Sequence, residues 1–142
     1  MPGYSGTPLP KKLGIKAGFR VYLAKAPAEV RAELRAALEE CTEVKQADVL
    51  DFTMLFTRSR VELAKEFSRR ARPLAPAGML WVSWPKKSSG VPTDLDENVV
   101  RNIGLDAGLV DVKVCAVTDV WSGLKFVRRV KDRPVKDRQK KK

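Results

Sequence analysis

Short apolar runs that favour β-strands alternate along this chain with amphipathic stretches of helical periodicity. Because they are rich in β-branched and aromatic residues, the runs at Phe19–Ala24, Asp48–Phe56 and Met79–Trp84 predict strands. Helices are predicted from Pro27 to about Glu40, from Ser59 to about Arg72, and from Thr93 to about Ala107. Strands joined through helices form right-handed βαβ units. The alternation therefore predicts an α/β fold with a mostly parallel central sheet flanked by helices.

The last part of the chain departs from this alternation. Two further β-rich runs, Leu109–Val117 and Leu124–Val130, are separated by a short segment around Ser122-Gly123, which predicts a C-terminal antiparallel hairpin with its turn there. A chain of 142 residues is long enough for one core and too short for two. We therefore expect a single α/β domain over residues 1–127. Residues 128–142 are expected to form a basic, disordered tail.

Local signals predict where helices begin and which faces they bury. Thr7 is expected to cap a short helical turn that Gly14 ends. Ser59 and Glu62 have the spacing of a capping box at the start of the second long helix. The buried face of that helix is predicted to consist of Val61, Ala64, Phe67 and Ala71. A short extra strand is also expected near Thr42–Lys45.

The composition excludes several classes of function. The chain has no histidine, which excludes His-based triads, imidazole acid–base catalysis and histidine-ligated metals. Its two cysteines, Cys41 and Cys115, are too few for a disulfide framework. No apolar run is long enough for a membrane span, and the first residues lack a signal-peptide core. We expect a cytoplasmic protein with no metal site and no membrane partner.

The formal charge of +11 is concentrated at one end of the chain. Residues 128–142 contain nine Lys and Arg residues and two Asp. This tail can contact nucleic acid nonspecifically, with Lys140, Lys141 and Lys142 on phosphates and Trp121 stacked on a base. It can equally be a solvated end that aids solubility. Trp81 and Trp84 lie in or at the end of an apolar strand, so they are predicted to pack in the core.

Cationic loops follow all three predicted parallel strands. The loops are Lys25-Ala26-Pro27, Thr57-Arg58-Ser59-Arg60 and Lys86-Lys87-Ser88-Ser89-Gly90. The carboxyl ends of parallel strands share one edge of the sheet, where ligands of open α/β sheets bind. Lysines can neutralise the charge of a bound anion, and hydroxyl groups can fix its orientation. The sequence therefore predicts an anion-binding site at this edge. Its residues are Lys86, Lys87, Ser88 and Ser89, supported by Arg58, Lys11 and Lys12, and its ligand is a small anion or an acidic protein segment.

Motifs that hold common cofactors are missing from the sequence. The loop after the first strand, Ala24-Lys25-Ala26-Pro27, has no glycine, whereas dinucleotide-binding folds use small residues there to approach pyrophosphate. Neither a Walker-type GxxxxGK[ST] nor a Gly-x-Ser-x-Gly motif occurs. We therefore predict no cofactor, no catalytic residue and no metal ligand.

Two resemblances accompany these predictions. The order of elements, with LGIKAGFRVYL as its opening strand, resembles the class I methyltransferase sheet with parts of its first half missing. This resemblance implies a single Rossmann-like domain, in which Ala24-Lys25-Ala26-Pro27 replaces the glycine-rich loop that covers the methionine part of S-adenosylmethionine. The chain is also similar to a bacterial family of short proteins of unknown function. The similar segments are Tyr4–Lys16, Trp84–Ser88, Thr93–Arg101 and Gly108–Val127.

Three hypotheses of function follow. The first is a non-catalytic binding or regulatory module with an anion-binding loop at the carboxyl edge of the sheet. The second is a nucleic-acid-associated protein that acts through its basic tail. The third is a divergent methyltransferase-like transferase, which the first resemblance implies.

Overall fold

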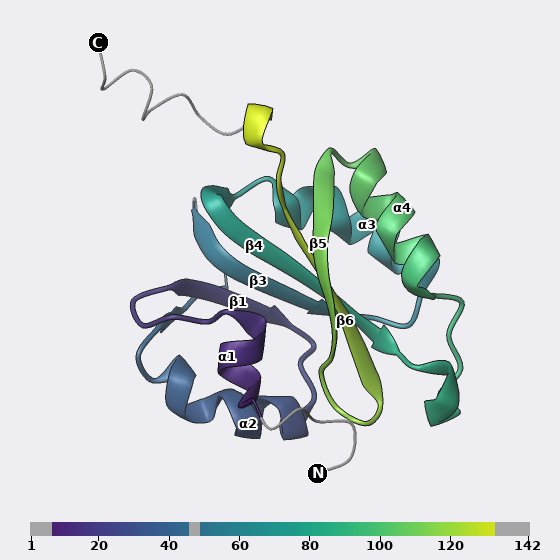
Figure 1. Ribbon diagram of the computed structural model, residues 1–142, viewed down its shortest axis with the longest axis horizontal. Coiled ribbons are helices and arrows are strands. Elements are labelled where there is room, and N and C mark those ends of the chain that lie inside the picture. Colours follow the sequence, from purple (N-terminus) through teal and green to yellow (C-terminus); the bar gives the residue numbers. More distant parts are fainter. Residues whose placement is uncertain (1–6, 46–48, 133–142) are drawn as a thin grey trace.

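A single six-stranded sheet forms the centre of the molecule, with helices on both faces (Figure 1). The computed structural model describes residues 7–45 and 49–132. The strands are β1 (Arg20–Ala24), β2 (Thr42–Glu43), β3 (Leu50–Phe56), β4 (Leu74–Pro85), β5 (Leu109–Ala116) and β6 (Trp121–Arg128). The helices are α1 (Leu9–Leu13), α2 (Ala28–Leu38), α3 (Arg60–Ala71) and α4 (Glu97–Asp106), with short 3-10 turns η1 (Lys87–Ser89) and η2 (Val130–Asp132). The predicted α/β class is confirmed.

The strand order is β2-β1-β3-β4-β6-β5. Strands β1 to β4 run parallel to one another, whereas β6 is antiparallel to both of its neighbours, β4 and β5. The expected short strand near residues 42–45 and the C-terminal antiparallel hairpin are therefore both present. Because β1, β3 and β4 are parallel, their carboxyl ends meet at one edge of the sheet, which positions the loops discussed below.

Two hydrophobic cores lie on opposite faces of the sheet. On one face, α1 and α2 bury Leu13 and Leu34 against the fully buried Trp81 of β4. On the other face, α3 and α4 pack on β4 and β6, with the rings of Phe67 and Phe126 in an edge-to-face contact at 5.1 Å. Figure 1 shows α1 and α2 in front of the sheet and α3 and α4 behind it. The layers are those of a three-layer α/β/α domain.

The tryptophans of β4 are core residues, as predicted. Trp81 is 0% exposed and Trp84 is 5% exposed. The indole N–H of Trp81 donates to the carbonyl of Leu13 at 3.0 Å, which satisfies a carbonyl at the C-terminal end of α1. This bond fixes the short helix α1 on the sheet, since five residues form too short a helix to be stable alone.

The start of α1 and the buried face of α3 differ from the predictions. The N-cap of α1 is Pro8 and not Thr7, because the helix begins one residue later, at Leu9. In α3 the buried residues are Leu63, Phe67 and Ala71, whereas Val61 is 63% exposed and Ala64 is also exposed. A helix that packs on a flat sheet buries a narrow stripe, here at i, i+4 and i+8. The prediction was therefore right for Phe67 and Ala71 and wrong for Val61 and Ala64.

The hairpin turn was also placed incorrectly. Ser122 and Gly123 lie within β6, and the turn occupies residues 117–120, between the two strands. The hydroxyl of Thr118 accepts hydrogen bonds from the backbone N–H groups of Val120 and Trp121, which holds this turn. This strand position holds glycine because a side chain at residue 123 would collide with Val117 and Trp81.

Arg128 ends β6 and binds the connection between α3 and the neighbouring strand β4. Its guanidinium donates to the carbonyls of Ala71, Arg72 and Leu74, at 2.7–3.2 Å. The strand β6 thus ends one residue after position 127, and the turn η2 follows it at Val130–Asp132. Among the residues that the structure describes, no helix is both long and apolar enough to cross a bilayer, and no group of three or more Cys, Asp and Glu residues is placed to hold a metal ion.

Candidate functional site

The carboxyl ends of β1 and β3 bring Lys25 and Thr57 together with the first turn of α3. Ser59 caps α3 by accepting a hydrogen bond from the backbone N–H of Glu62 at 3.1 Å. In a complete capping box the Glu62 carboxylate would turn back to the N–H of Ser59. Here the Thr57 hydroxyl accepts from that N–H at 3.2 Å, and Glu62 is directed to other partners. The predicted cap at Ser59 is confirmed, and the other half of the capping box is replaced.

Lys25 and Glu62 form an ion pair across the edge of the sheet. The ammonium of Lys25 lies 2.5 Å from Glu62 Oε2, and the Thr57 hydroxyl donates to the other carboxylate oxygen. Lys25, and after it Thr57, lower the pKa of Glu62, while Glu62 raises the pKa of Lys25. Both side chains are partly exposed, at 69% and 37%, so the pair contributes little to stability. Its effect is to place a cation and an anion beside the strand ends.

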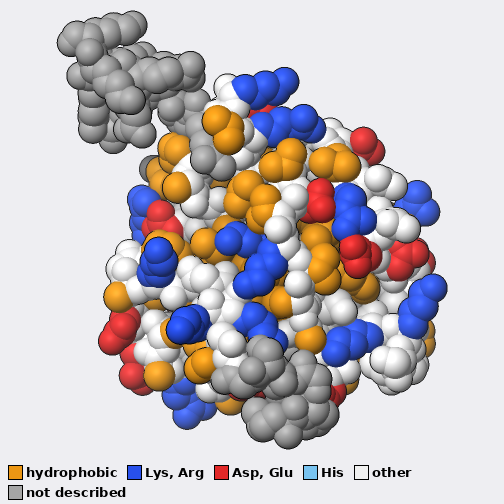
Figure 2. Space-filling view, in the orientation of Figure 1, with side chains coloured by type: hydrophobic (Ala, Val, Ile, Leu, Met, Phe, Trp, Pro, Cys, Tyr) orange, Lys and Arg blue, Asp and Glu red, His pale blue; other side chains and the backbone are white. Residues whose placement is uncertain are grey.

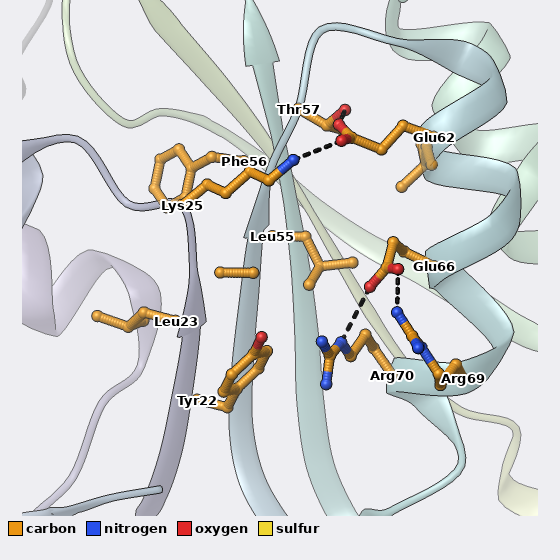
Figure 3. Close-up of a pocket in the computed structure, with 12 residues that line it drawn as sticks. Tyr22, Leu23, Lys25, Leu55, Phe56, Thr57, Glu62, Glu66, Arg69 and Arg70 are labelled. Carbon is orange, nitrogen blue, oxygen red and sulfur yellow. Dashed lines mark hydrogen bonds and ion pairs between the residues drawn. The ribbon is translucent and has the colours of Figure 1, made fainter. Parts of the chain in front are cut away.

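A pocket of about 260 Å³ lies below this ion pair, between β1, β3 and α3 (Figure 3). Its walls include Tyr22 and Leu55 from the strands. The Arg70 guanidinium lies 4.4 Å from the centre of the Tyr22 ring and donates to Glu66 at 3.1 Å, and Arg69 pairs with the same carboxylate. The charged groups of this pocket are therefore largely paired with one another, as the dashed lines of Figure 3 show.

A second, open depression of about 720 Å³ adjoins it on the other side of the Lys25–Glu62 pair. Arg58, Ser59, Pro92 and Trp121 line it, together with Lys25, Phe56, Thr57 and Glu62. Among the described residues, the Arg58 guanidinium has no hydrogen bond or ion pair, and neither has the indole N–H of Trp121. Lys25 and the Thr57 hydroxyl already bind Glu62, so among the described residues the donors left for a ligand are Arg58, the Ser59 hydroxyl proton and the Trp121 indole.

The N-terminus of α3 is already occupied by a carboxylate of the chain itself. Asp94 Oδ1 accepts from the backbone N–H of Arg60 at 2.7 Å, and Thr93 donates its hydroxyl to the Arg58 carbonyl at 2.7 Å. Asp96 caps α4 through the N–H of Val99 at 2.8 Å. The two aspartates therefore accept hydrogen bonds from backbone N–H groups at the helix N-termini. An external anion at this edge would have to be bound mainly by side chains.

The structure separates the predicted site residues into three groups. Arg58 lies in the depression. The turn after β4 does not line the depression: Lys86 is half-buried, Lys87 and Ser88 are exposed, and the Ser89 hydroxyl donates to the Lys86 carbonyl at 2.6 Å. Ser89 therefore stabilises its own turn. Among the described residues, no side-chain partner is found for the ammonium groups of Lys86 and Lys87.

Lys11 and Lys12 belong to a different part of the surface. Lys11 is exposed on α1, and the Lys12 ammonium donates to the carbonyl of Ala116 at the end of β5, at 3.0 Å. The first helical turn therefore docks beside the β5–β6 hairpin. Neither lysine lines the depression that contains Arg58.

Trp121 lies at the start of β6 and not in a turn. It is partly buried, and its ring meets Phe56 edge-to-face at 5.3 Å and 80°. It lines the depression, but its packing against Phe56 makes it less exposed than the sequence predicted. The other residues proposed for nucleic acid, Lys140, Lys141 and Lys142, lie outside the described residues, as does Tyr4 of the first similar segment.

Sequence reasoning missed Lys25 and Glu62 as members of one site. The available signal was the position of Lys25 directly after a strand, in a loop that favours glycine in dinucleotide-binding folds. The backbone of Lys25 is left-handed, with φ of 62°, the conformation that such a glycine adopts readily. Glu62 gave no separate signal, because the capping box already accounted for it.

Taken together, the sheet order and the helices on both faces define a Rossmann-like, methyltransferase-like α/β domain with a basic carboxyl edge. The family model described as "Protein of unknown function (DUF3052)" matches residues 10–130. The chain belongs to this family. No match to the sequence is found among curated proteins.

Solved structures with the same fold include several methyltransferases. A SAM-dependent methyltransferase from Aquifex aeolicus is 19% identical, with a TM-score of 0.59, and the match covers 82% of this chain and 85% of that protein. Magnesium protoporphyrin IX methyltransferase from Synechocystis PCC 6803 with bound SAM is 13% identical, with a TM-score of 0.55 and coverage of 85% and 74%. The fibrillarin pre-rRNA processing protein of Methanococcus jannaschii is 11% identical, with a TM-score of 0.52 and coverage of 80% and 68%. These similarities confirm the fold that the first resemblance implied.

Proposed function

We propose that this protein is a non-catalytic binding module that takes a small anionic ligand at the carboxyl edge of its sheet. One observation carries the proposal: among the described residues, the Arg58 guanidinium and the Trp121 indole N–H have no partner, and both residues line an open depression with Ser59 and the Lys25–Glu62 pair. A phosphorylated small molecule matches these groups, since charge-assisted hydrogen bonds from cations and hydroxyls hold phosphate oxygens. The loop Lys86–Ser89 then adds an outer cationic rim, with Lys86 and Lys87 acting at longer range. A cytoplasmic location stays a prediction.

A thermal-shift experiment tests this proposal. The unfolding temperature is measured with inorganic phosphate, nucleoside monophosphates, phosphorylated sugars and S-adenosylmethionine, and the dissociation constant of each stabilising compound is then determined. Arg58→Ala should weaken binding of a stabilising phosphate compound roughly tenfold or more, because a hydrogen bond to a charged group is lost. The double variant Lys86→Ala/Lys87→Ala should weaken it less, and mainly at low salt.

The outcomes of this experiment separate the candidates for the site. Unchanged affinity of Arg58→Ala would contradict binding in the depression. A larger loss in Lys86→Ala/Lys87→Ala would move the site to the turn after β4. Arg69→Ala serves as the matched control, because it removes an arginine from the neighbouring pocket.

Methyl transfer is the second candidate function, favoured by the methyltransferases that share this fold, one of them solved with bound SAM. It requires S-adenosylmethionine to bind at the carboxyl edge, where Lys25 pairs with Glu62. Stabilisation of the protein by S-adenosylmethionine and by its demethylated product, but not by phosphate compounds, would favour this candidate over an anion-binding module.

The nucleic-acid hypothesis makes a different prediction. If the basic tail carries binding, a chain that ends at Asp132 should lose affinity for single-stranded oligonucleotides. The affinity of the full chain should also fall steeply with salt, because phosphate contacts release counterions.

A further inference from the structure

Four lysines gather on the face of the sheet that α1 covers, away from the carboxyl-edge depression. Lys12 belongs to α1, Lys16 follows that helix, Lys113 lies on β5 and Lys125 on β6. We refer to them as the lysine cluster. Lys113 and Lys125 are paired across the two strands, and Lys125 is also paired with Trp81 of β4. Cross-strand partners point to the same face of a sheet, so these two lysines lie beside the core residue Trp81.

Part of this arrangement serves the fold. Lys113 donates its ammonium to the Lys12 carbonyl at 3.0 Å, and Lys12 donates to the Ala116 carbonyl at 3.0 Å. Cations near the last carbonyls of a helix satisfy acceptors that have no partner within it. These two bonds fasten the end of α1 to β5, and they account for the ammonium groups of Lys12 and Lys113.

Lys125 has no such role. It lies on β6, between two other strands, and its side chain is half-buried, with the ammonium about 4.0 Å from the position that a Cβ on Gly14 would take. Burial, and after it the charges of Lys113 and Lys16, lower the pKa of Lys125. Among the described residues, its ammonium makes no hydrogen bond or ion pair. Desolvation and like-charge repulsion therefore act against the fold at this position.

Apolar side chains border the lysine cluster. Val110 and Val127 are paired across β5 and β6, both are half-buried, and Val127 is also paired with Met79 of the core on this face. Val112, at the irregularity of the edge strand β5, is 53% exposed. Figure 2 shows Lys and Arg side chains in the middle of this face, with hydrophobic side chains beside them. A cationic surface bordered by valines is complementary to a segment that carries both acidic and apolar residues.

We propose that the lysine cluster and the valines beside it form a docking surface for an acidic, partly apolar segment of a partner protein. The four lysines come from α1, the connection after it and two strands, so they span a surface that an extended segment can follow. Carboxylates of the segment pair with Lys16, Lys113 and Lys125, and its apolar residues cover Val110 and Val127. Binding supplies Lys125 with an opposite charge, which it lacks among the described residues. This surface is independent of the anionic ligand proposed for the carboxyl edge.

Fluorescence anisotropy with a labelled peptide of alternating Glu and Leu residues tests the docking surface on the full chain. The variant Lys113→Gln/Lys125→Gln removes two charges from the cluster. The control Lys45→Gln/Lys65→Gln removes the same charge from exposed positions after β2 and on α3. We expect peptide affinity to fall roughly tenfold or more in the first variant and less than about threefold in the control. Arg58→Ala should leave peptide binding unchanged, which separates this test from the test of the carboxyl edge.

Other outcomes would overturn the proposal. Equal losses of peptide affinity in the two double variants would show a nonspecific charge effect. The absence of peptide binding to the unsubstituted protein would rule out the docking surface. A single-stranded oligonucleotide that binds more tightly than the peptide, with the same dependence on Lys113 and Lys125, would assign the surface to nucleic acid. The single variant Lys125→Gln guards against misfolding, since it should keep or raise the unfolding temperature by removing a desolvated charge.

Discussion

At the residue scale, Lys25 combines a left-handed backbone with an ion pair at the carboxyl edge of the sheet. A non-glycine residue at φ of 62° is uncommon, and strain of this kind concentrates at ligand sites. The sequence showed a lysine where a dinucleotide-binding fold has glycine, but it could not show the backbone conformation. In that conformation the lysine side chain reaches Glu62.

Substitution of Lys25 separates strain from charge. Lys25→Gly and Lys25→Ala both remove the exposed ion pair, but only glycine relieves the left-handed backbone. We expect the glycine variant to be more stable than the alanine variant by about 1 kcal/mol, measured by urea denaturation. Equal stabilities of the two variants would show that this residue is not strained.

Gly104 gives a second prediction at the residue scale. It lies within α4, where alanine normally stabilises a helix by up to about 1 kcal/mol. A Cβ at this position would overlap the ring of Phe126, which the facing core holds in contact with Phe67. We therefore expect Gly104→Ala to destabilise the protein by about 1–3 kcal/mol in the same denaturation experiment. A stabilised variant would mean that the Phe126 ring can move away.

An ion pair that joins β1 to β3 is expected to contribute to acid stability at the scale of elements. Asp51 on β3 accepts hydrogen bonds from the backbone and the guanidinium of Arg20 on β1, at 2.8–3.0 Å. Arg20 lowers the pKa of Asp51. Because the pKa is lower in the folded state, the ionised carboxylate stabilises the fold above the unfolded value of about 3.9, and this stabilisation is lost as the pH falls through the folded value.

Asp51→Asn should accordingly lower the unfolding temperature at neutral pH. It should also reduce the further fall of the unfolding temperature between about pH 5 and pH 2. Thermal unfolding across this range measures both effects. The control is Asp119→Asn, at the exposed turn between β5 and β6, which should show the same pH dependence of the unfolding temperature as the unsubstituted protein. An unchanged acid dependence in Asp51→Asn would exclude the β1–β3 contact as a cause of acid unfolding.

Elements with strong local signals were predictable from the sequence, and those decided by packing were not. Ser59 and Gly14 were predicted as helix boundaries because capping and left-handed turns depend on neighbouring residues only. Part of the buried face of α3 and the position of the hairpin turn were predicted wrongly, because long-range contacts decide them: Leu63 faces the sheet, and Gly123 fits against Trp81. The convergence of the loops after β1 and β3 followed from parallel strands, whereas the docking of α1 beside the hairpin did not follow from any local pattern.

At the scale of the whole molecule, the end of the domain can be tested by truncation. Residue 127 was the expected boundary, but Arg128 binds three carbonyls around the α3–β4 connection. A chain that ends at Asp132 should keep its unfolding temperature within about 2 °C, whereas a chain that ends at Val127 should lose roughly 4 °C or more, since hydrogen bonds from a charged group contribute about 1.5–3 kcal/mol. Equal unfolding temperatures would show that Arg128 does not stabilise the fold.

The proposed site for a small anionic ligand is the depression beside Arg58 and Trp121. A ¹H–¹⁵N NMR titration with a nucleoside monophosphate locates the ligand, because the three indole signals report from different places. Binding in the depression should give saturable shifts of the Trp121 indole and of the Arg58 and Ser59 amides. The indole signal of Trp81, buried and bonded to Leu13, should stay unchanged. Shifts confined to residues 86–90, or no saturable shift at Arg58 and Trp121 with any phosphate compound, would contradict the account.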